Sequence, residues 1–130
     1  MIIDSHTHAW EYWPYQPPVP DPSSRGTVEQ LLFEMDNNGV DEAVVVCANI
    51  DHNPSNNAYI ARCVQQYPTR LHHFADVDSA WSTTYHTGGA AERLRVVAEQ
   101  YSLKGFTHYL RPEDDGRWLY SREGLEFFKV

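Results

Sequence analysis

Short apolar runs alternate with amphipathic stretches along most of the chain. Residues 1–3 are apolar, and residues 43–48 have the sequence Ala-Val-Val-Val-Cys-Ala, an unbroken apolar run typical of a parallel strand covered on both faces. Two further segments, residues 71–77 and 103–109, complete the candidate strands. The pattern therefore predicts four strands, each separated from the next by enough chain to form a helix.

Helix signals fill these connections. Thr27 and Gln30 have the spacing of a capping box, and they predict a first helix that ends at Gly39 in the left-handed conformation. Pro54 is predicted to begin a second helix. Apolar residues at helical spacing predict a third helix around residues 94–101, and a fourth is predicted over residues 121–130.

Four strand–helix repeats predict an α/β fold with parallel strands joined by right-handed crossovers. No glycine-rich phosphate loop follows the first strand, which argues against a dinucleotide-binding fold and favours the N-terminal half of an eight-stranded TIM barrel. We therefore expect residues 1–130 to form one partial barrel domain of about four β/α units, truncated before strand five. A complete flavodoxin-like domain is less favoured, because four strands leave open edges and the last helix has no stop signal.

The first strand runs directly into Asp4, His6 and His8. Because side chains of a strand alternate between its faces, these three residues are expected on one face. Neutral imidazole is the commonest side-chain metal ligand, and a nearby carboxylate can fix the tautomer of a ligating histidine. We interpret His6 and His8 as ligands of a divalent metal and Asp4 as their outer partner. A structural pair of histidines near a chain terminus is the alternative.

Residues 9–26 form a long segment rich in aromatic residues and proline. The prolines exclude a regular helix or a central strand. Long loops are often functional, so this one is expected either to wall a pocket beside the histidines or to cover an open end of the core. Its aromatic residues are Trp10, Tyr12, Trp13 and Tyr15, and its prolines are Pro14, Pro17, Pro18, Pro20 and Pro22.

Polar residues also follow the other strands, and a barrel gathers its functional residues at the carboxyl ends of its strands. His108 and Arg111, after the fourth strand, are predicted to contact a substrate carboxylate, with an ordinary exposed loop arginine as the alternative. Asp51, His52, Asp76 and His108 are also candidates for a third metal ligand.

Charge and composition narrow the choice of partners. The formal charge of −8 opposes nucleic acid and anionic membranes, and it favours a small-molecule substrate. No apolar run approaches the roughly 18 residues of a membrane span, and Asp4 interrupts the N-terminus before any signal-peptide core. A cytoplasmic location is therefore expected, with Cys47 and Cys63 as reduced core residues.

With its Asp-x-His-x-His strand and four repeats, the chain resembles the amidohydrolase-related (amidohydrolase 2) branch of the metal-dependent hydrolases, which have a TIM-barrel fold. A Met-Asp-x-x-Gly-Val helix end makes the resemblance more specific than the two histidines alone. The matching segments are residues 2–8 (Ile-Ile-Asp-Ser-His-Thr-His), 31–45, 67–71 (Tyr-Pro-Thr-Arg-Leu) and 103–106 (Leu-Lys-Gly-Phe).

In that family the two histidines of the first strand bind a divalent metal. The resemblance therefore assigns this role to His6 and His8 and implies zinc, or manganese, as the cofactor. The family completes its site with histidines of the fifth and sixth strands and an aspartate of the eighth, which this sequence does not reach. Because a catalytic zinc normally takes three protein ligands, the chain alone is expected to be inactive.

The resemblance implies a hydrolase in which metal-activated water attacks a small lactone or a carboxylated ring compound. Some lactonases of this branch work without a tightly bound metal. One alternative is a non-oxidative decarboxylase (carboxy-lyase) of the same family, in which a carboxylate protonates a ring carbon. Another is a catalytically incomplete fragment or a non-enzymatic α/β module, which would form a homo-oligomer through its open strand edges.

Overall fold

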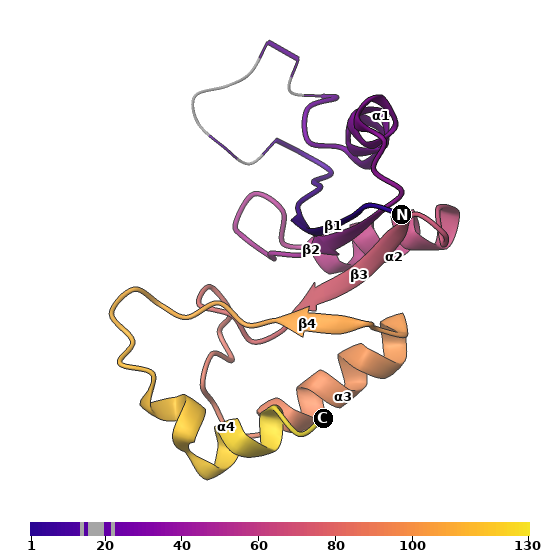
Figure 1. Cartoon of the computed structure of the whole chain (residues 1–130). Helices are drawn as coiled ribbons and strands as arrows, with labels where there is room; N and C mark the ends of the chain where they lie inside the picture. Colours follow the sequence, from indigo (N-terminus) through magenta and orange to yellow (C-terminus); the bar gives the residue numbers. More distant parts are fainter. Residues whose placement is uncertain (14, 16–19, 22) are drawn as a thin grey trace.

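The computed structural model describes residues 1–13, 15, 20–21 and 23–130, and it contains one four-stranded parallel sheet. The strands are β1 (Ile3–Thr7), β2 (Glu42–Val46), β3 (Leu71–Asp76) and β4 (Gly105–Thr107), in that spatial order. The helices are α1 (Val28–Asn38), α2 (Asn56–Gln66), α3 (Ala90–Tyr101), the 3-10 helix η1 (Arg117–Tyr120) and α4 (Arg122–Phe127). The predicted alternation of strands and helices is confirmed, and the four arrows in Figure 1 point to one side of the molecule.

The helix boundaries follow local capping chemistry. The Thr27 hydroxyl accepts the backbone N–H of Gln30, and Gly39 ends α1 at φ 66°, so the first predicted helix is confirmed at both ends. Helix α2 begins at Asn56, two residues after the predicted start at Pro54, because residues 51–55 are used in turns.

The end of the chain departs further from its prediction. The predicted fourth helix is shorter, since α4 ends at Phe127, and η1 precedes it without a prediction. Strand β4 has three residues where seven were predicted, because within the described chain it pairs only with β3, and only over Gly105–Thr107. A strand that has one neighbour gains ladder hydrogen bonds on one side alone.

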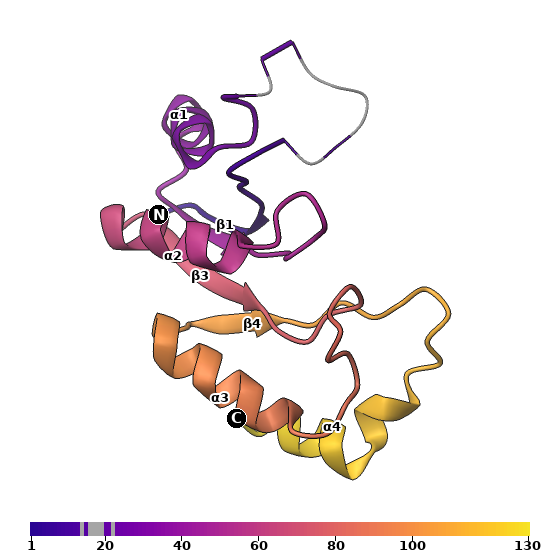
Figure 2. The ribbon, with the colours of Figure 1, turned by 180° about the vertical axis from the view of Figure 1, so that it is seen from behind.

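A buried cluster fastens the sheet to α2. Ala43 and Val45 of β2 and Leu71 of β3 pack with Ile60 and Cys63 of α2. In Figure 2, which shows the molecule from behind, α2 lies in front of these strands, whereas in Figure 1 it lies behind them. One face of the sheet therefore carries the helices, as in the outer layer of a barrel.

A second buried cluster joins β3 to the last two helices. Ala75 and Val77 pack with Leu94 of α3 and with Phe127 of α4, which is completely buried. The predicted core cysteines, Cys47 and Cys63, are free thiols, and burial raises the pKa of both. No helix in the described part of the chain is long and apolar enough to cross a lipid bilayer.

His73 makes the stability of this core dependent on pH. Its side chain is 3% exposed, neither ring nitrogen has a hydrogen-bond partner among the described residues, and burial lowers its pKa to about 4. An unfolded histidine titrates near pH 6.5, so the unfolded chain takes up the proton first as the pH falls. We expect stability that is complete above about pH 6.5 to decline toward pH 4, by up to about 3 kcal/mol from this residue.

Urea unfolding at pH 7 and at pH 5 checks this expectation in the unsubstituted chain and in His73→Leu. The variant should lose much of the difference between the two pH values, whereas His52→Asn, at an exposed histidine, should retain it. An unchanged difference in His73→Leu would show that other groups cause the pH dependence.

Candidate functional site at the carboxyl ends of the strands

The two histidines of the first strand lie next to each other at its carboxyl end. The His6 and His8 ring centroids are 5.1 Å apart, with the rings nearly perpendicular. His8 Nδ1 lies 2.7 Å from the backbone oxygen of Val46. A carbonyl oxygen can only accept, so Nδ1 carries the hydrogen and Nε2 presents its lone pair. Val46 thus prepares His8 in the tautomer that a metal ligand needs.

Asp4 has a different position from the one that simple alternation predicts. The register pairs Asp4 with Ala43 but Thr7 with Val45, so β1 contains one extra residue between these pairs. Ala43 and Val45 share a face, which puts Asp4 and Thr7 on that face and breaks the alternation with the histidines. The Asp4 carboxylate accepts the backbone N–H of His6, 3.0 Å away, and so shapes the irregular strand. Its role as the outer partner of a metal-bound histidine stays a prediction.

A third ligand does not join the histidines within the residues that the structure describes. No group of three or more His, Cys, Asp or Glu side chains converges there as a metal site. His52 and Asp51 are exposed in the turn after β2, and Asp76 is engaged in hydrogen bonds of its own. Within the described chain, the end of β1 therefore brings two imidazoles together without a third candidate ligand.

Aromatic side chains line the chain that follows His8. The ring of Trp10 is buried and stacks on His8 at a centroid distance of 5.7 Å. The backbone N–H of Trp10 donates to the backbone oxygen of Gly26. Tyr15 packs edge-on against both Trp10 and Trp13. These contacts agree with an aromatic wall beside the histidines. Four of the prolines that defined this loop prediction, Pro14, Pro17, Pro18 and Pro22, lie outside the described residues.

Three asparagines that no sequence pattern singled out hold the loops of this edge together. Asn53 exchanges two hydrogen bonds with the backbone of Tyr12. Asn56 accepts from Ala48 N and donates to Ala9 O, and the Asn57 side chain bonds the backbone N–H and C=O of Asp76. Their concentration near the start of α2 was the available signal, because buried asparagines must satisfy their amides.

Asp76, at the end of β3, is a buried carboxylate fixed by three donors. It accepts from Asn49 N at 2.6 Å, from Trp81 Nε1 at 2.9 Å and from the Ser79 hydroxyl. Burial raises its pKa, while the hydrogen bonds from Ser79, Asn49 and Trp81 oppose this rise. Asp76 also lines a small cavity of about 130 Å³.

Arg111 and His108 follow β4 in different environments. Arg111 is exposed, its Nε donates to Ala80 O, and its guanidinium lies over the Tyr85 ring at 4.7 Å. The hydrogen bonds of its side chain to described residues engage Nε alone, which leaves the outer edge of the guanidinium for a carboxylate. His108 instead donates from Nδ1 to Val77 O, and its Nε2 faces another histidine, His86.

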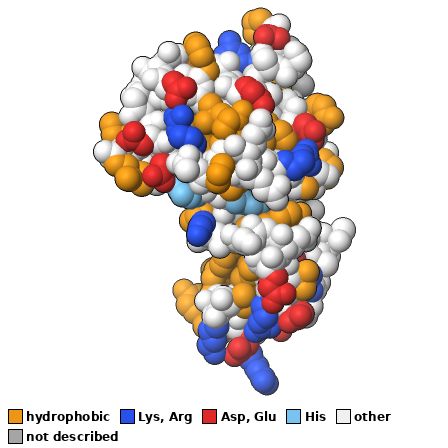
Figure 3. All heavy atoms as spheres, turned by 90° about the vertical axis from the view of Figure 1, so that its right-hand side faces the viewer, with side chains coloured by type: hydrophobic (Ala, Val, Ile, Leu, Met, Phe, Trp, Pro, Cys, Tyr) orange, Lys and Arg blue, Asp and Glu red, His pale blue; other side chains and the backbone are white. Residues whose placement is uncertain are grey.

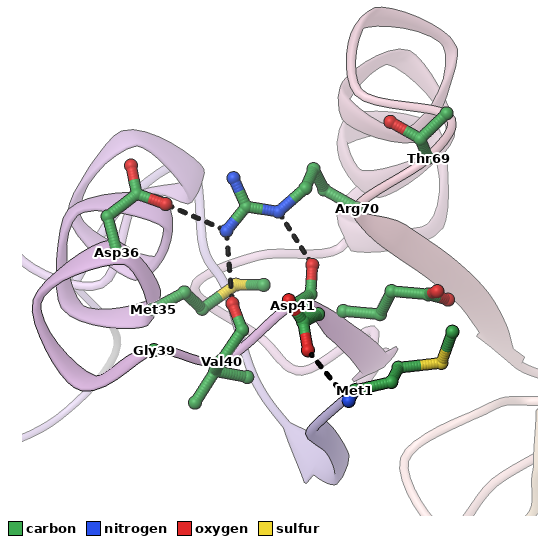
Figure 4. Close-up of a pocket in the computed structure, with 9 residues that line it drawn as sticks. Met1, Met35, Asp36, Gly39, Val40, Asp41, Thr69 and Arg70 are labelled. Atoms are coloured by element: carbon green, nitrogen blue, oxygen red, sulfur yellow. Dashed lines mark hydrogen bonds and ion pairs between the residues drawn. The ribbon is translucent and has the colours of Figure 1, made fainter.

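A cavity of about 670 Å³ lies at the opposite edge of the sheet, where the strands begin. Arg70 donates there to Asp36, Val40 O and Asp41 O, as Figure 4 shows. The N-terminal ammonium of Met1 forms an ion pair with the Asp41 carboxylate. The pKa of Asp41 is lowered mainly by the hydrogen bond from the Ile2 backbone N–H and, to a smaller extent, by this ammonium. Figure 3 shows charged side chains around an apolar patch on this side of the molecule. Because these charges are paired with one another, this edge is suited to stability rather than to ligand binding.

Comparison with solved structures finds chains of similar fold. One is a crystal structure of a probable 2-pyrone-4,6-dicarboxylic acid hydrolase from Acinetobacter baumannii with citric acid bound, with a TM-score of 0.62 and 21% identity over 98% of this chain. Another is a crystal structure of an amidohydrolase II, with a TM-score of 0.60 and 19% identity over 99% of this chain. No protein-family model matches the sequence, and no curated protein matches it either.

The aligned region covers 44% and 46% of the two solved chains, so this chain spans less than half of their length. Four parallel strands with intervening helices, aligned with less than half of each longer chain, agree with the predicted half of a TIM barrel. His6, His8 and Arg111 thus lie at the carboxyl edge of a half-barrel sheet.

Proposed function

We propose that this chain carries part of the active site of a metal-dependent hydrolase of the amidohydrolase-related family. The observation that carries the proposal is the pair His6 and His8 at the carboxyl end of β1, with His8 Nδ1 bound to a main-chain carbonyl. Barrel enzymes build their sites at this edge, and carbonyl-held imidazoles are typical metal ligands. Both named neighbours are hydrolases or amidohydrolases, which supports the reaction class.

A divalent ion, zinc or else manganese, fits the donors present as two of its ligands. When bound, such an ion supplies the Lewis acidity that hydrolysis of an ester or lactone requires. His8 contributes Nε2, and Val46 holds the ring in place by the bond to Nδ1. His6 stands beside it, at the bulge stabilised by Asp4. Since no third candidate ligand joins them among the described residues, the rest of the coordination sphere would be supplied by further chain or by a second copy.

The substrate class that we propose is a small lactone or a carboxylated ring compound. The solved hydrolase named above is named for 2-pyrone-4,6-dicarboxylic acid, a ring lactone with two carboxyl groups. In this chain Arg111 would pair with such a carboxylate through the edge of its guanidinium, since Tyr85 and Ala80 O already fix its orientation. We assign this role to Arg111 and not to His108, because both ring nitrogens of His108 face partners within the chain.

The incomplete ligand set supports a second candidate, a chain that has no activity alone. The solved neighbours are more than twice as long, so an active protein would need a longer chain or a homo-oligomer that joins open edges of β1 and β4.

Non-oxidative decarboxylation would use the same histidines and Arg111. Product analysis separates it from hydrolysis, because decarboxylation releases carbon dioxide.

Metal content tests the central proposal. His6→Asn combined with His8→Asn keeps a side-chain amide near the Val46 carbonyl but removes the imidazole Nε2 donors. After chelation and equilibrium dialysis against zinc, this double variant should hold about one zinc ion per chain less than the unsubstituted chain. His52→Asn, at an exposed histidine, is the matched control and should retain the full content. Equal zinc content in all three proteins would refute the assignment of His6 and His8.

A further inference from the structure

A second pair of histidines lies outside the proposed site, between the loops that follow β3 and β4. The His86 ring is enclosed between Tyr85, at 3.7 Å, and Trp118, at 4.2 Å, and Arg111 lies over the far face of Tyr85. His108 lies edge to edge with His86, in a plane that is only 22° away from parallel. The two Nε2 atoms are 3.2 Å apart.

The other ring nitrogen of each histidine has a defined partner. His108 Nδ1 lies 3.1 Å from Val77 O, which can only accept, so this nitrogen carries a hydrogen. His86 Nδ1 lies 3.1 Å from the Asp114 carboxylate, an ion-pair contact, and this carboxylate also accepts the hydrogen of the Tyr85 hydroxyl. Asp114 is therefore an acceptor, and His86 Nδ1 carries a hydrogen as well.

This assignment leaves two lone pairs directed at each other. A neutral imidazole with hydrogen on Nδ1 has only a lone pair on Nε2. Two such atoms repel each other at 3.2 Å unless a cation lies between or beside them. We propose that His86 and His108 bind one divalent transition-metal ion of the zinc class, at a site separate from His6 and His8.

The spacing fits this ion. With zinc–nitrogen bonds of about 2.0–2.1 Å, two imidazole nitrogens in a tetrahedral site lie about 3.3 Å apart. The ion-pair contact of His86 with Asp114 and the hydrogen bond of His108 to Val77 O resemble the carboxylate and carbonyl partners that usually orient ligating histidines. Two protein ligands leave the other positions of the ion for water or for a substrate anion.

A further observation favours a metal ion over a shared proton. Trp118, which stacks on both imidazoles, has a buried Nε1–H without a partner in the described chain, and water on a bound ion would supply the acceptor.

The backbone conformation of His86 is unusual for a residue other than glycine. Its φ is 54°, in the left-handed region that non-glycine residues adopt at a cost in free energy, and such strain often accompanies functional sites. A bound ion would join the loop after β3 to the loop after β4. Because Tyr85 precedes His86 and supports Arg111, the ion would also fix the position of that guanidinium.

The test uses the full chain with His6→Asn and His8→Asn, so that the first pair does not contribute. This background chain, stripped of metal and titrated with cobalt(II), should bind about one ion per chain with visible absorption, and zinc should displace it. His86→Asn or His108→Asn is then added to this background. Each substitution keeps an amide donor, near Asp114 or near Val77 O respectively, but removes the imidazole Nε2. Asparagine also tolerates the positive φ at position 86. Each should weaken binding by on the order of 100-fold, whereas His52→Asn should not.

A second measurement leaves His86 and His108 unsubstituted and so does not depend on the folding of these variants. In the ¹⁵N NMR spectrum of the background chain, zinc should shift the Nε2 resonances of both histidines, while both Nδ1 atoms remain protonated. Ring signals that do not respond to zinc would mean that the pair shares only a proton, which would overturn the proposal. Cobalt binding that is equal in the Asn variants and the background would overturn it as well. Neither result bears on zinc binding by His6 and His8, which the background chain lacks.

Discussion

Replacing Asn56 by alanine is expected to lower the free energy of unfolding by about 2–6 kcal/mol, because two buried backbone groups lose their partners at about 1–3 kcal/mol each. Asn56 is 2% exposed, and its amide joins Ala48 N, at 3.0 Å, to Ala9 O, at 2.9 Å. Both alanines are themselves buried, so water cannot replace the lost bonds without opening the structure. Urea unfolding followed by circular dichroism measures the change.

Asn38→Ala is the matched control for this experiment. Asn38 is exposed at the end of α1, and its amide donates to Glu34 O within the same helix. Its replacement should change the free energy of unfolding by about 0.5 kcal/mol or less. Similar losses in the two variants would mean that the amide of Asn56 does not hold the loops after β1 and β2. In that case the environment of His8, which directly precedes Ala9, would depend on other contacts.

Phe127→Ala is expected to cost about 3–5 kcal/mol of stability, since it leaves a cavity in the smaller buried cluster. The Phe127 ring is completely buried, and it contacts the rings of Phe106, His108 and Trp118 at centroid distances of 5.2, 5.2 and 5.6 Å. A domain with ordinary stability of about 5–15 kcal/mol would lose a large part of it. Urea unfolding followed by tryptophan fluorescence, to which Trp118 contributes, measures the loss.

The neighbouring Phe128 provides the control for this substitution. Its side chain is 52% exposed although it lies in the same sequence context, so Phe128→Ala should cost less than about 1.5 kcal/mol. An equal cost for both phenylalanines would show that burial does not decide the effect. It would also mean that α4 contributes less to the cluster around β3 than its contacts indicate.

The sequence contained enough information for the order of the elements and for one part of the site. The apolar run 43–48, the capping box at Thr27 and the left-handed Gly39 are local signals, and the structure places β2 and α1 where they predict. The polar residues that follow each strand also predicted where the site lies. Parallel strands separated by helices all point the same way, so the residues that follow them gather at one edge of the sheet. His6 and His8 were found for the same reason, since two residues at this spacing need only a local strand to come together.

Other features depended on contacts between segments far apart in the sequence. The extra residue in β1, which separates Asp4 from the histidines, follows from the register against β2, and a strand pattern alone does not reveal such a shift. The partners of Asn56 lie 47 and 8 residues away, and a polar side chain in the first turn of a helix is usually exposed.

The sequence by itself determined the alternation of strands and helices, the direction of the sheet and the histidine pair of β1, because these features depend on side-chain period and capping within short segments. Only the tertiary structure decided that His86 meets His108, 22 residues away, and that Asp114 and Val77 O hold their other nitrogens. The direction of a ring nitrogen depends on the packing of two loops against α4. That packing is set by the buried Phe127 and the partly buried Trp118 that packs against it, and no local pattern encodes this contact.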